Sequence, residues 1–148
     1  MFTKREHVKV LAKNVVTRLE QDEAIVLNPR MRQNIYQDLY LKLEPLILTD
    51  EEVKEKVIAE LGSKSDALGD SNSAESDQFK AAKSVIMNKI GENALAGLYY
   101  QRPVKNVAQI VADFLMNHHL VEDVFPSDEE LEKTIVDYFK RFNPEQLH

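Results

Sequence analysis

The sequence TDEEV at residues 49–53 recurs as SDEEL at residues 127–131. Each copy places a threonine or a serine three positions before a glutamate, which is the capping box that begins many helices. The acidic side chains within each copy also suit the positive end of the helix dipole. Apolar residues then follow at helical spacing. Both motifs therefore predict the start of a helix, and their likeness suggests that one unit occurs twice in the chain.

The segments that precede the two motifs match as well. Pro29 and Pro103 each follow a short connector and open a predicted helix, as proline commonly does at the first helical position. These two helices are expected to reach about residues 45 and 119. Further amphipathic stretches precede them, at residues 3–22 and from residue 78 to about residue 98. The chain thus reads as helix, connector, helix, loop and helix, twice over.

The register of the two halves favours a duplication. Ile35 aligns with Ile110, and Asp38 with Asp113, at an offset of 75 positions. The offset becomes 78 at the two capping motifs, after a short insertion. Because the two offsets hold over successive helices, we interpret the chain as a diverged internal repeat.

The predicted fold class is therefore all-α, with six helices in two repeated three-helix units, residues 1–62 and residues 78–148. The one departure that we allow is a very short two-stranded element formed by residues 24–27 and 98–101. Between the units, residues 63–77 contain five serines, several acidic residues and few apolar ones. Such a composition cannot bury enough apolar surface to order itself, so we expect a flexible acidic linker there.

Composition limits the function. The chain has no cysteine, so it offers no thiolate for metal binding or nucleophilic catalysis. No apolar stretch approaches the roughly 20 residues that span a bilayer, and the first residues lack the apolar core of a secretory signal. We therefore expect a cytoplasmic protein. The net charge of −6 argues against a dedicated nucleic-acid binder but is compatible with a local basic face.

Candidate catalytic and metal-binding groups are few. His118 and His119 are adjacent, so on a helix they project about 100° apart and cannot hold one metal ion as a pair four positions apart would. The acidic residues of both capping motifs are explained by the helix dipole. The sequence contains no glycine-rich phosphate loop and no nucleophile elbow. We predict no catalytic residue, no metal ligand and no cofactor, and we favour a protein that is not an enzyme.

Five residues form the candidate partner-binding set. Tyr99 and Tyr100 lie beside Arg102 in the connector before the fifth expected helix, and tyrosine and arginine are enriched at protein interfaces. We expect one tyrosine to pack inside, and the other, where it is exposed beside Arg102, to resemble an interface anchor. Val10 and Val16 lie off the main apolar stripe of the first helix, which indicates a second contact surface.

A second candidate set is basic and could bind an anion. Arg5, Lys9 and Lys13 are spaced i, i+4 and i+8, so they form one ridge of the first helix. Arg30 and Arg32 flank the start of the second helix, where arginines and unpaired backbone N–H groups can hold an anion. Nucleic acid or an acidic lipid surface would suit these residues, whereas the simpler interpretation is a solvated helix face.

Two segments resemble a known family. They are VVTRL at residues 15–19 followed by AIV at residues 24–26, and VEDVF at residues 121–125 followed by Asp128 and Leu131. Through these packing and capping patterns, and over nearly its whole length, the chain resembles the bacterial family named domain of unknown function 507. The resemblance implies a cytoplasmic bacterial protein, mostly helical, with no assigned activity. It carries over no functional residues.

The leading hypothesis is a non-enzymatic helical module that binds another protein, or a second copy of itself, through a groove between the two halves. Surplus apolar helix surface and the lack of catalytic motifs favour this hypothesis. The alternative is a binder of an anionic surface, nucleic acid or acidic lipid, through the ridge on the first helix. The sequence indicates no small-molecule substrate.

Overall fold

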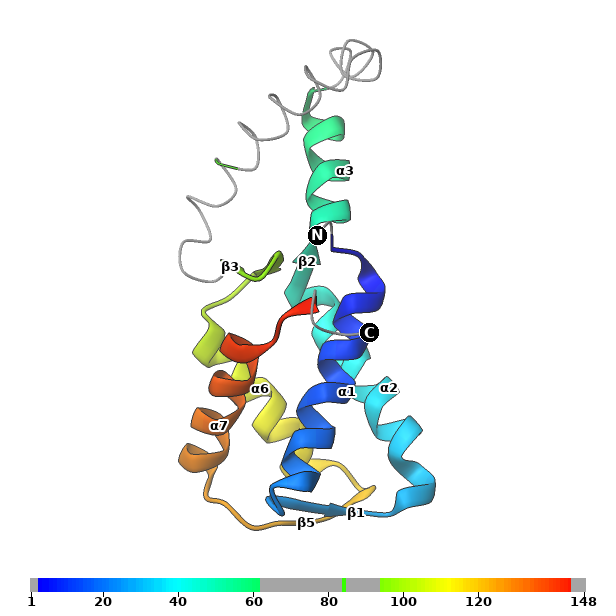
Figure 1. The fold of residues 1–148 in the computed structure, drawn as a ribbon, viewed down its shortest axis with the longest axis vertical. Helices are drawn as coiled ribbons and strands as arrows, with labels where there is room; N and C mark the ends of the chain where they lie inside the picture. The colour runs from blue at the N-terminus through cyan, green and yellow to red at the C-terminus, as the bar shows by residue number, and fades with distance from the viewer. Residues whose placement is uncertain (1–2, 62–83, 85–93, 145–148) are drawn as a thin grey trace.

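The computed structural model describes residues 3–61, 84 and 94–144. Four helices of this part surround one hydrophobic core: α1 (Arg5–Gln21), α2 (Arg32–Leu43), α6 (Val104–Asn117) and α7 (Asp128–Arg141). α1 packs against α2, α6 packs against α7, and smaller contacts join α1 to α7 and α2 to α6 (Figure 1). Helices from both halves of the sequence therefore build the same interior.

Short strands and turns of 3-10 helix connect these helices. The strands are β1 (Ile25–Leu27), β2 (Ile47–Thr49), β3 (Ala94–Leu95), β4 (Leu98–Tyr100) and β5 (Val121–Val124). The 3-10 turns are η1 (Pro29–Met31) and η2 (Glu44–Leu46), and a further helix, α3, covers Asp50–Leu61.

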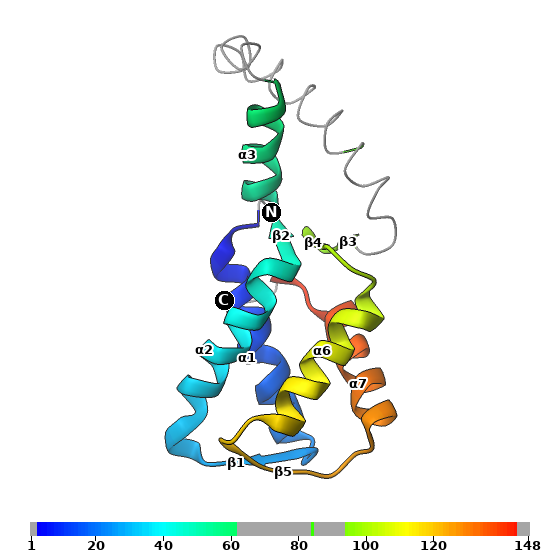
Figure 2. The same cartoon turned by 180° about the vertical axis from the view of Figure 1, so that it is seen from behind.

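The strands form two small antiparallel sheets at opposite ends of the four helices (Figures 1 and 2). In one sheet β1 pairs with β5, and Ile25 lies opposite Val124. In the other sheet the order is β2, β4 and β3, and Thr49 lies opposite Leu98. Each sheet thus joins a strand of the first half of the sequence to a strand of the second half.

The all-α prediction is wrong, because the structure is a mixture of helices with two antiparallel sheets. The picture of two three-helix units is also wrong, since α1, α2, α6 and α7 share one core. Residues 24–27 and 98–101 do supply strands, but β1 and β4 do not pair with each other. Each pairs with a strand that follows α2 or α6, in segments that the sequence pattern presents as loops.

A hairpin stands where the last residues of the helix expected to reach residue 98 were placed. Residues 94–100 form β3, a turn at Ala96 and Gly97, and β4. Gly97 has a φ of +82°, and a Cβ placed there would lie 2.8 Å from Cγ2 of Thr3. Both facts require glycine at this position. Most of the expected fourth helix and the predicted linker at residues 63–77 lie outside the described residues.

The buried positions of α2 and α6 do not correspond at the offset of 75 that the sequence alignment predicts. α2 buries Ile35, Leu39 and Leu43, and the core positions of α6 include Val107, Val111 and Leu115. These pairs are 72 positions apart, whereas an offset of 75 would match Ile35 to the only partly buried Ile110. Three residues are close to one helical turn, so both registers preserve the apolar spacing and the sequence pattern does not separate them.

The starts of the helices agree with the capping predictions in part. The backbone N–H of Glu130 donates to Oγ of Ser127 at 3.3 Å, as the capping motif of α7 predicts. Thr3 and Glu6 have the same spacing, which predicts a capping box, but this box is not formed, because the hydroxyl of Thr3 instead donates to the carbonyl oxygen of Gly97 at 2.6 Å. α1 therefore begins two residues later than expected, at Arg5.

α3 projects beyond the four-helix core and follows directly on β2 (Figures 1 and 2). Its first turn is anchored, since Val53 is fully buried. Among the described helices none combines the length and the apolar character needed to cross a membrane.

Candidate docking groove

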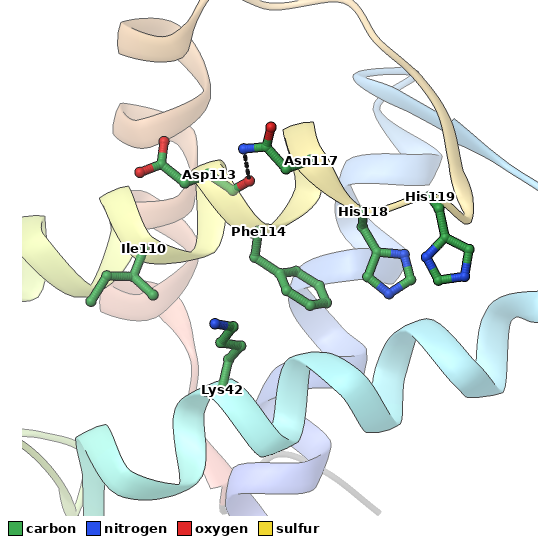
Figure 3. Close-up of a pocket in the computed structure, with 7 residues that line it drawn as sticks. All are labelled: Lys42, Ile110, Asp113, Phe114, Asn117, His118 and His119. Atoms are coloured by element: carbon green, nitrogen blue, oxygen red, sulfur yellow. Dashed lines mark hydrogen bonds between the residues drawn. The ribbon is translucent and has the colours of Figure 1, made fainter.

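A groove of about 550 Å³ separates parts of α2 and α6. Lys42 reaches into it from α2, and the other lining residues belong to α6 or follow its last turn (Figure 3). They are Ile110, Asp113, Phe114, Asn117, His118 and His119. The groove therefore lies between the two halves of the sequence, where the leading hypothesis places a binding surface.

The wide apolar face of α6 explains why apolar side chains border this groove. One side of the face is fully buried in the core, with Val111 and Leu115 among its members. Ile110 and Phe114 lie one turn apart at the edge of that face and are only partly buried. An amphipathic helix with so broad an apolar face leaves some of it uncovered when its neighbours pack on one side alone.

His118 links the end of α6 to α2. Its Nε2 lies 2.8 Å from Oδ2 of Asp38, and its Nδ1 accepts a hydrogen bond of 3.1 Å from the backbone N–H of Leu120. Because Nδ1 accepts, the ring proton sits on Nε2 and is donated to Asp38. Both ring nitrogens are thus engaged, and the side chain is only 8% exposed.

The rings at this end of the groove form a short stack. His119 lies parallel to His118, with centroids 4.9 Å apart and 13° between the planes. Phe114 lies on another side of His118 with its centroid at the same distance and a tilt of 54°. The three rings line one end of the groove, and His119 at the outer end of the stack is exposed (Figure 3).

The charged groups of the groove lie apart from one another. Lys42 points from α2 toward Ile110 and Phe114 (Figure 3). Asn117 donates from Nδ2 to the backbone carbonyl of Asp113 at 2.8 Å, and the carboxylate of Asp113 points away from Lys42 (Figure 3). Within the described residues, no three histidine, aspartate or glutamate side chains gather closely enough to hold a metal ion. The groove can therefore offer an apolar wall, one cation and one anion to a ligand.

The predicted partner-binding residues are mostly inside the protein. Tyr99 and Tyr100 are each 1% exposed, and Val16 is fully buried. Val10 is partly buried and packs against the core. Of the five, Arg102 alone is exposed. Neither tyrosine can act as an exposed anchor, because β4 is the central strand of its sheet and all three of its residues are buried.

The two tyrosines have different polar surroundings. The hydroxyl of Tyr99 donates to Oδ1 of the buried Asp50, whose Oδ2 accepts the backbone N–H of Thr3 at 3.1 Å. Burial and this hydrogen bond raise the pKa of Tyr99 well above its ordinary value. The hydroxyl of Tyr100 has no hydrogen-bond partner among the described residues, and its ring meets Phe139 edge-on at 5.4 Å. Burial alone raises the pKa of Tyr100.

Two of the five predicted anion-binding residues are held by the protein itself. Arg5 donates to the backbone carbonyls of Glu44 and Ile47, at 3.2 and 3.1 Å, and pairs with Glu52. Arg32 makes a two-pronged ion pair with Glu20. The predicted continuous ridge on the first helix is thus absent, because Arg5 turns to the β2 side.

The three remaining cations of that set are exposed. Arg30 lies at the start of η1. Lys9 and Lys13 line a second groove, between α1 and α2.

The pairing of Asp38 with His118 is the part of the candidate site that sequence reasoning missed. Nothing in the sequence pattern marks Asp38 as the partner of His118, which lies 80 positions later in the chain. Only the approach of α2 to α6 brings the two together.

No protein-family model, no curated protein and no solved structure matches the chain. The resemblance to domain of unknown function 507 is therefore neither supported nor excluded, and it stays a prediction.

Proposed function

We propose that the protein is a non-enzymatic interaction module that receives a segment of a partner protein in the groove between α2 and α6. The observation that carries the proposal is the groove of about 550 Å³, in which Ile110 and Phe114 stay partly exposed beside Lys42. Concave surfaces with an apolar wall and a few convergent polar groups are typical of binding sites.

The engaged state of His118 supports binding rather than catalysis. A general base needs a ring nitrogen that can take a proton from a substrate. Nδ1 of His118 accepts from Leu120 and Nε2 donates to Asp38, so neither nitrogen serves that purpose. The histidine instead fixes the shape of the groove by holding the end of α6 against α2.

The lining indicates the chemistry of the partner segment. Ile110 and Phe114 suit an aromatic or aliphatic anchor, the kind of side chain that contributes most to binding energy at protein interfaces. Lys42 makes no ion pair within the described residues, so it can pair with a carboxylate of the partner. We therefore expect a segment with an apolar anchor next to an acidic residue.

The cytoplasmic location stays a prediction.

An affinity-capture experiment with matched variants tests this function. Ile110→Glu places a charge on the apolar wall, and Gln109→Glu places the same charge on the neighbouring exposed position of α6, outside the groove. We expect the wild type and Gln109→Glu to retain the same partner from cell extract. Ile110→Glu should lose it, because the partner's apolar anchor would then bury a carboxylate.

Two results would contradict the proposal. One is equal retention of the partner by Ile110→Glu. The other is a wild-type chain that retains no protein and migrates as a monomer in size-exclusion chromatography. Circular dichroism of both variants checks that the helices are intact, and a partner lost only from a folded Ile110→Glu chain supports the groove.

A further inference from the structure

A second groove, of about 220 Å³, lies between α1 and α2 and is lined by different residues of α2 from those at the docking groove. α1 contributes Lys9 and Lys13, which are exposed and lie one turn apart. All other lining residues are uncharged. The groove therefore carries a local positive charge in a chain whose net charge is −6.

The position of Lys9 is defined by an aromatic ring. Its Nζ lies 5.2 Å from the centroid of the Tyr40 ring, within the range of a cation–π contact. Tyr40 is itself only 7% exposed, so it forms a fixed support beneath the ammonium group. Lys9 is thereby kept beside the groove and within reach of an anion there.

The opposite wall of the groove is polar and aromatic. Gln33 and Gln37 lie one turn apart on α2 and are both exposed, and each amide offers donors and an acceptor. Tyr36 lies between them in sequence and is partly exposed, with its hydroxyl 3.3 Å from Oγ1 of Thr17. A planar ring could lie along Tyr36 while the amides meet its edge.

We propose that this groove binds a nucleoside monophosphate, with the phosphate between Lys9 and Lys13 and the base along Tyr36 within reach of Gln33 and Gln37. Two cations match one phosphate, and glutamine amides suit the edge of adenine. The volume lies below the roughly 300–1,000 Å³ of pockets that enclose a whole ligand, so the groove would hold a nucleotide along one side and leave the rest of it in solvent. Two phosphate contacts are few for a nucleic-acid surface, where affinity grows with the number of phosphates neutralised, and this favours one nucleotide over a longer strand.

Calorimetric titration of the full chain with adenosine monophosphate tests the proposal. Adenosine and inorganic phosphate serve as its two fragments. We expect the nucleotide to bind at least about tenfold more tightly than either fragment, because it alone engages both walls. The side-chain amide signals of Gln33 and Gln37 should shift in nuclear magnetic resonance spectra on addition of the nucleotide.

Variants separate the two walls. Lys9→Met with Lys13→Met should weaken adenosine monophosphate at least about tenfold. The control Lys105→Met with Lys133→Met removes two exposed lysines elsewhere and should leave the affinity unchanged. Gln33→Leu with Gln37→Leu should weaken adenosine monophosphate but not inorganic phosphate. Ile110→Glu should have no effect, so the outcome is independent of the docking groove.

Four outcomes would overturn the proposal. They are the lack of saturable binding by adenosine monophosphate, equal affinity for inorganic phosphate, equal loss in the Lys105 and Lys133 control, and tighter binding of oligoadenylate or of a hexaglutamate peptide. The last two ligands would indicate a nucleic-acid strand or an acidic protein segment in place of a single nucleotide.

Discussion

Tyr99 and Tyr100 show how two adjacent residues of the same type can have opposite effects on stability. Both are buried to the same extent. The hydroxyl of Tyr99 donates to the buried carboxylate of Asp50, whereas that of Tyr100 has no partner among the described residues. A buried polar group without a partner loses its hydration and gains nothing in return. The buried hydroxyl of Tyr100 therefore lowers the free energy of unfolding.

Replacing each tyrosine by phenylalanine tests this difference. Tyr100→Phe should raise the free energy of unfolding by about 1 kcal/mol, because it removes the unpaired hydroxyl and keeps the ring against Phe139. Tyr99→Phe should lower it by about 1–3 kcal/mol, because Asp50 then loses a donor in a buried position. Urea denaturation of both variants and the wild type measures the two changes. A decrease for Tyr100→Phe would contradict the prediction.

At the scale of helices and strands, the sequence predicts what is local. The first helix was expected over residues 3–22 and is observed as Arg5–Gln21, because its apolar stripe repeats within a few residues. β2 and β5 were missed, since three or four residues carry too little pattern and their partners lie far away in the chain. The positions of the described helices were thus predictable, but β2, β5, the strand pairing and the alignment of α2 with α6 were not.

In the candidate site too, local features were predictable from the sequence and long-range contacts were not. A groove between the halves was anticipated, but its walls depend on how α2 meets α6. Arg5 was assigned to a basic ridge from its spacing, yet carbonyls of η2 and β2 and the carboxylate of Glu52 surround it in the fold. Spacing along a helix fixes the direction of a side chain and leaves its neighbours undetermined.

The link from α6 to α2 through His118 should hold the segment that follows α6 in its folded position. His118→Phe keeps an aromatic ring of similar shape but removes both hydrogen bonds, to Asp38 and from Leu120. We expect the backbone amide of Leu120 to exchange with solvent about tenfold faster in this variant, since one lost hydrogen bond is worth about 1 kcal/mol or more. Hydrogen exchange followed by nuclear magnetic resonance measures the rate, with the amides inside α1 as an internal reference. An unchanged exchange rate at Leu120 would show that His118 does not hold this segment in place.

For the whole molecule, buried tyrosines predict a loss of stability in alkaline solution. Burial raises the pKa of Tyr99, Tyr100 and Tyr138, and the latter also donates to Asp22. The unfolded chain releases these protons near pH 10, while the folded chain keeps them to higher pH. The stabilisation is thus complete below about pH 10 and falls as the pH rises further, by about 1.4 kcal/mol per pH unit for each tyrosine.

Comparison of the wild type with Tyr100→Phe isolates this effect from the titration of lysines, which is common to both. The variant should lose stability less steeply above about pH 10, by about 1.4 kcal/mol per pH unit. Denaturation curves at several alkaline pH values give the two slopes. Parallel slopes would show that Tyr100 ionises in the folded chain as readily as in the unfolded one.

The exchange of strands between the halves bears on how the protein is made. β1 finds its partner only when β5 exists, because Ile25 lies opposite Val124. A ribosome adds about 5–20 residues per second, so β1 and the apolar face of α1 stay uncovered in the nascent chain for several seconds or more. Chaperones that bind nascent chains can contact these apolar surfaces in that interval, before α7 completes the hydrophobic core.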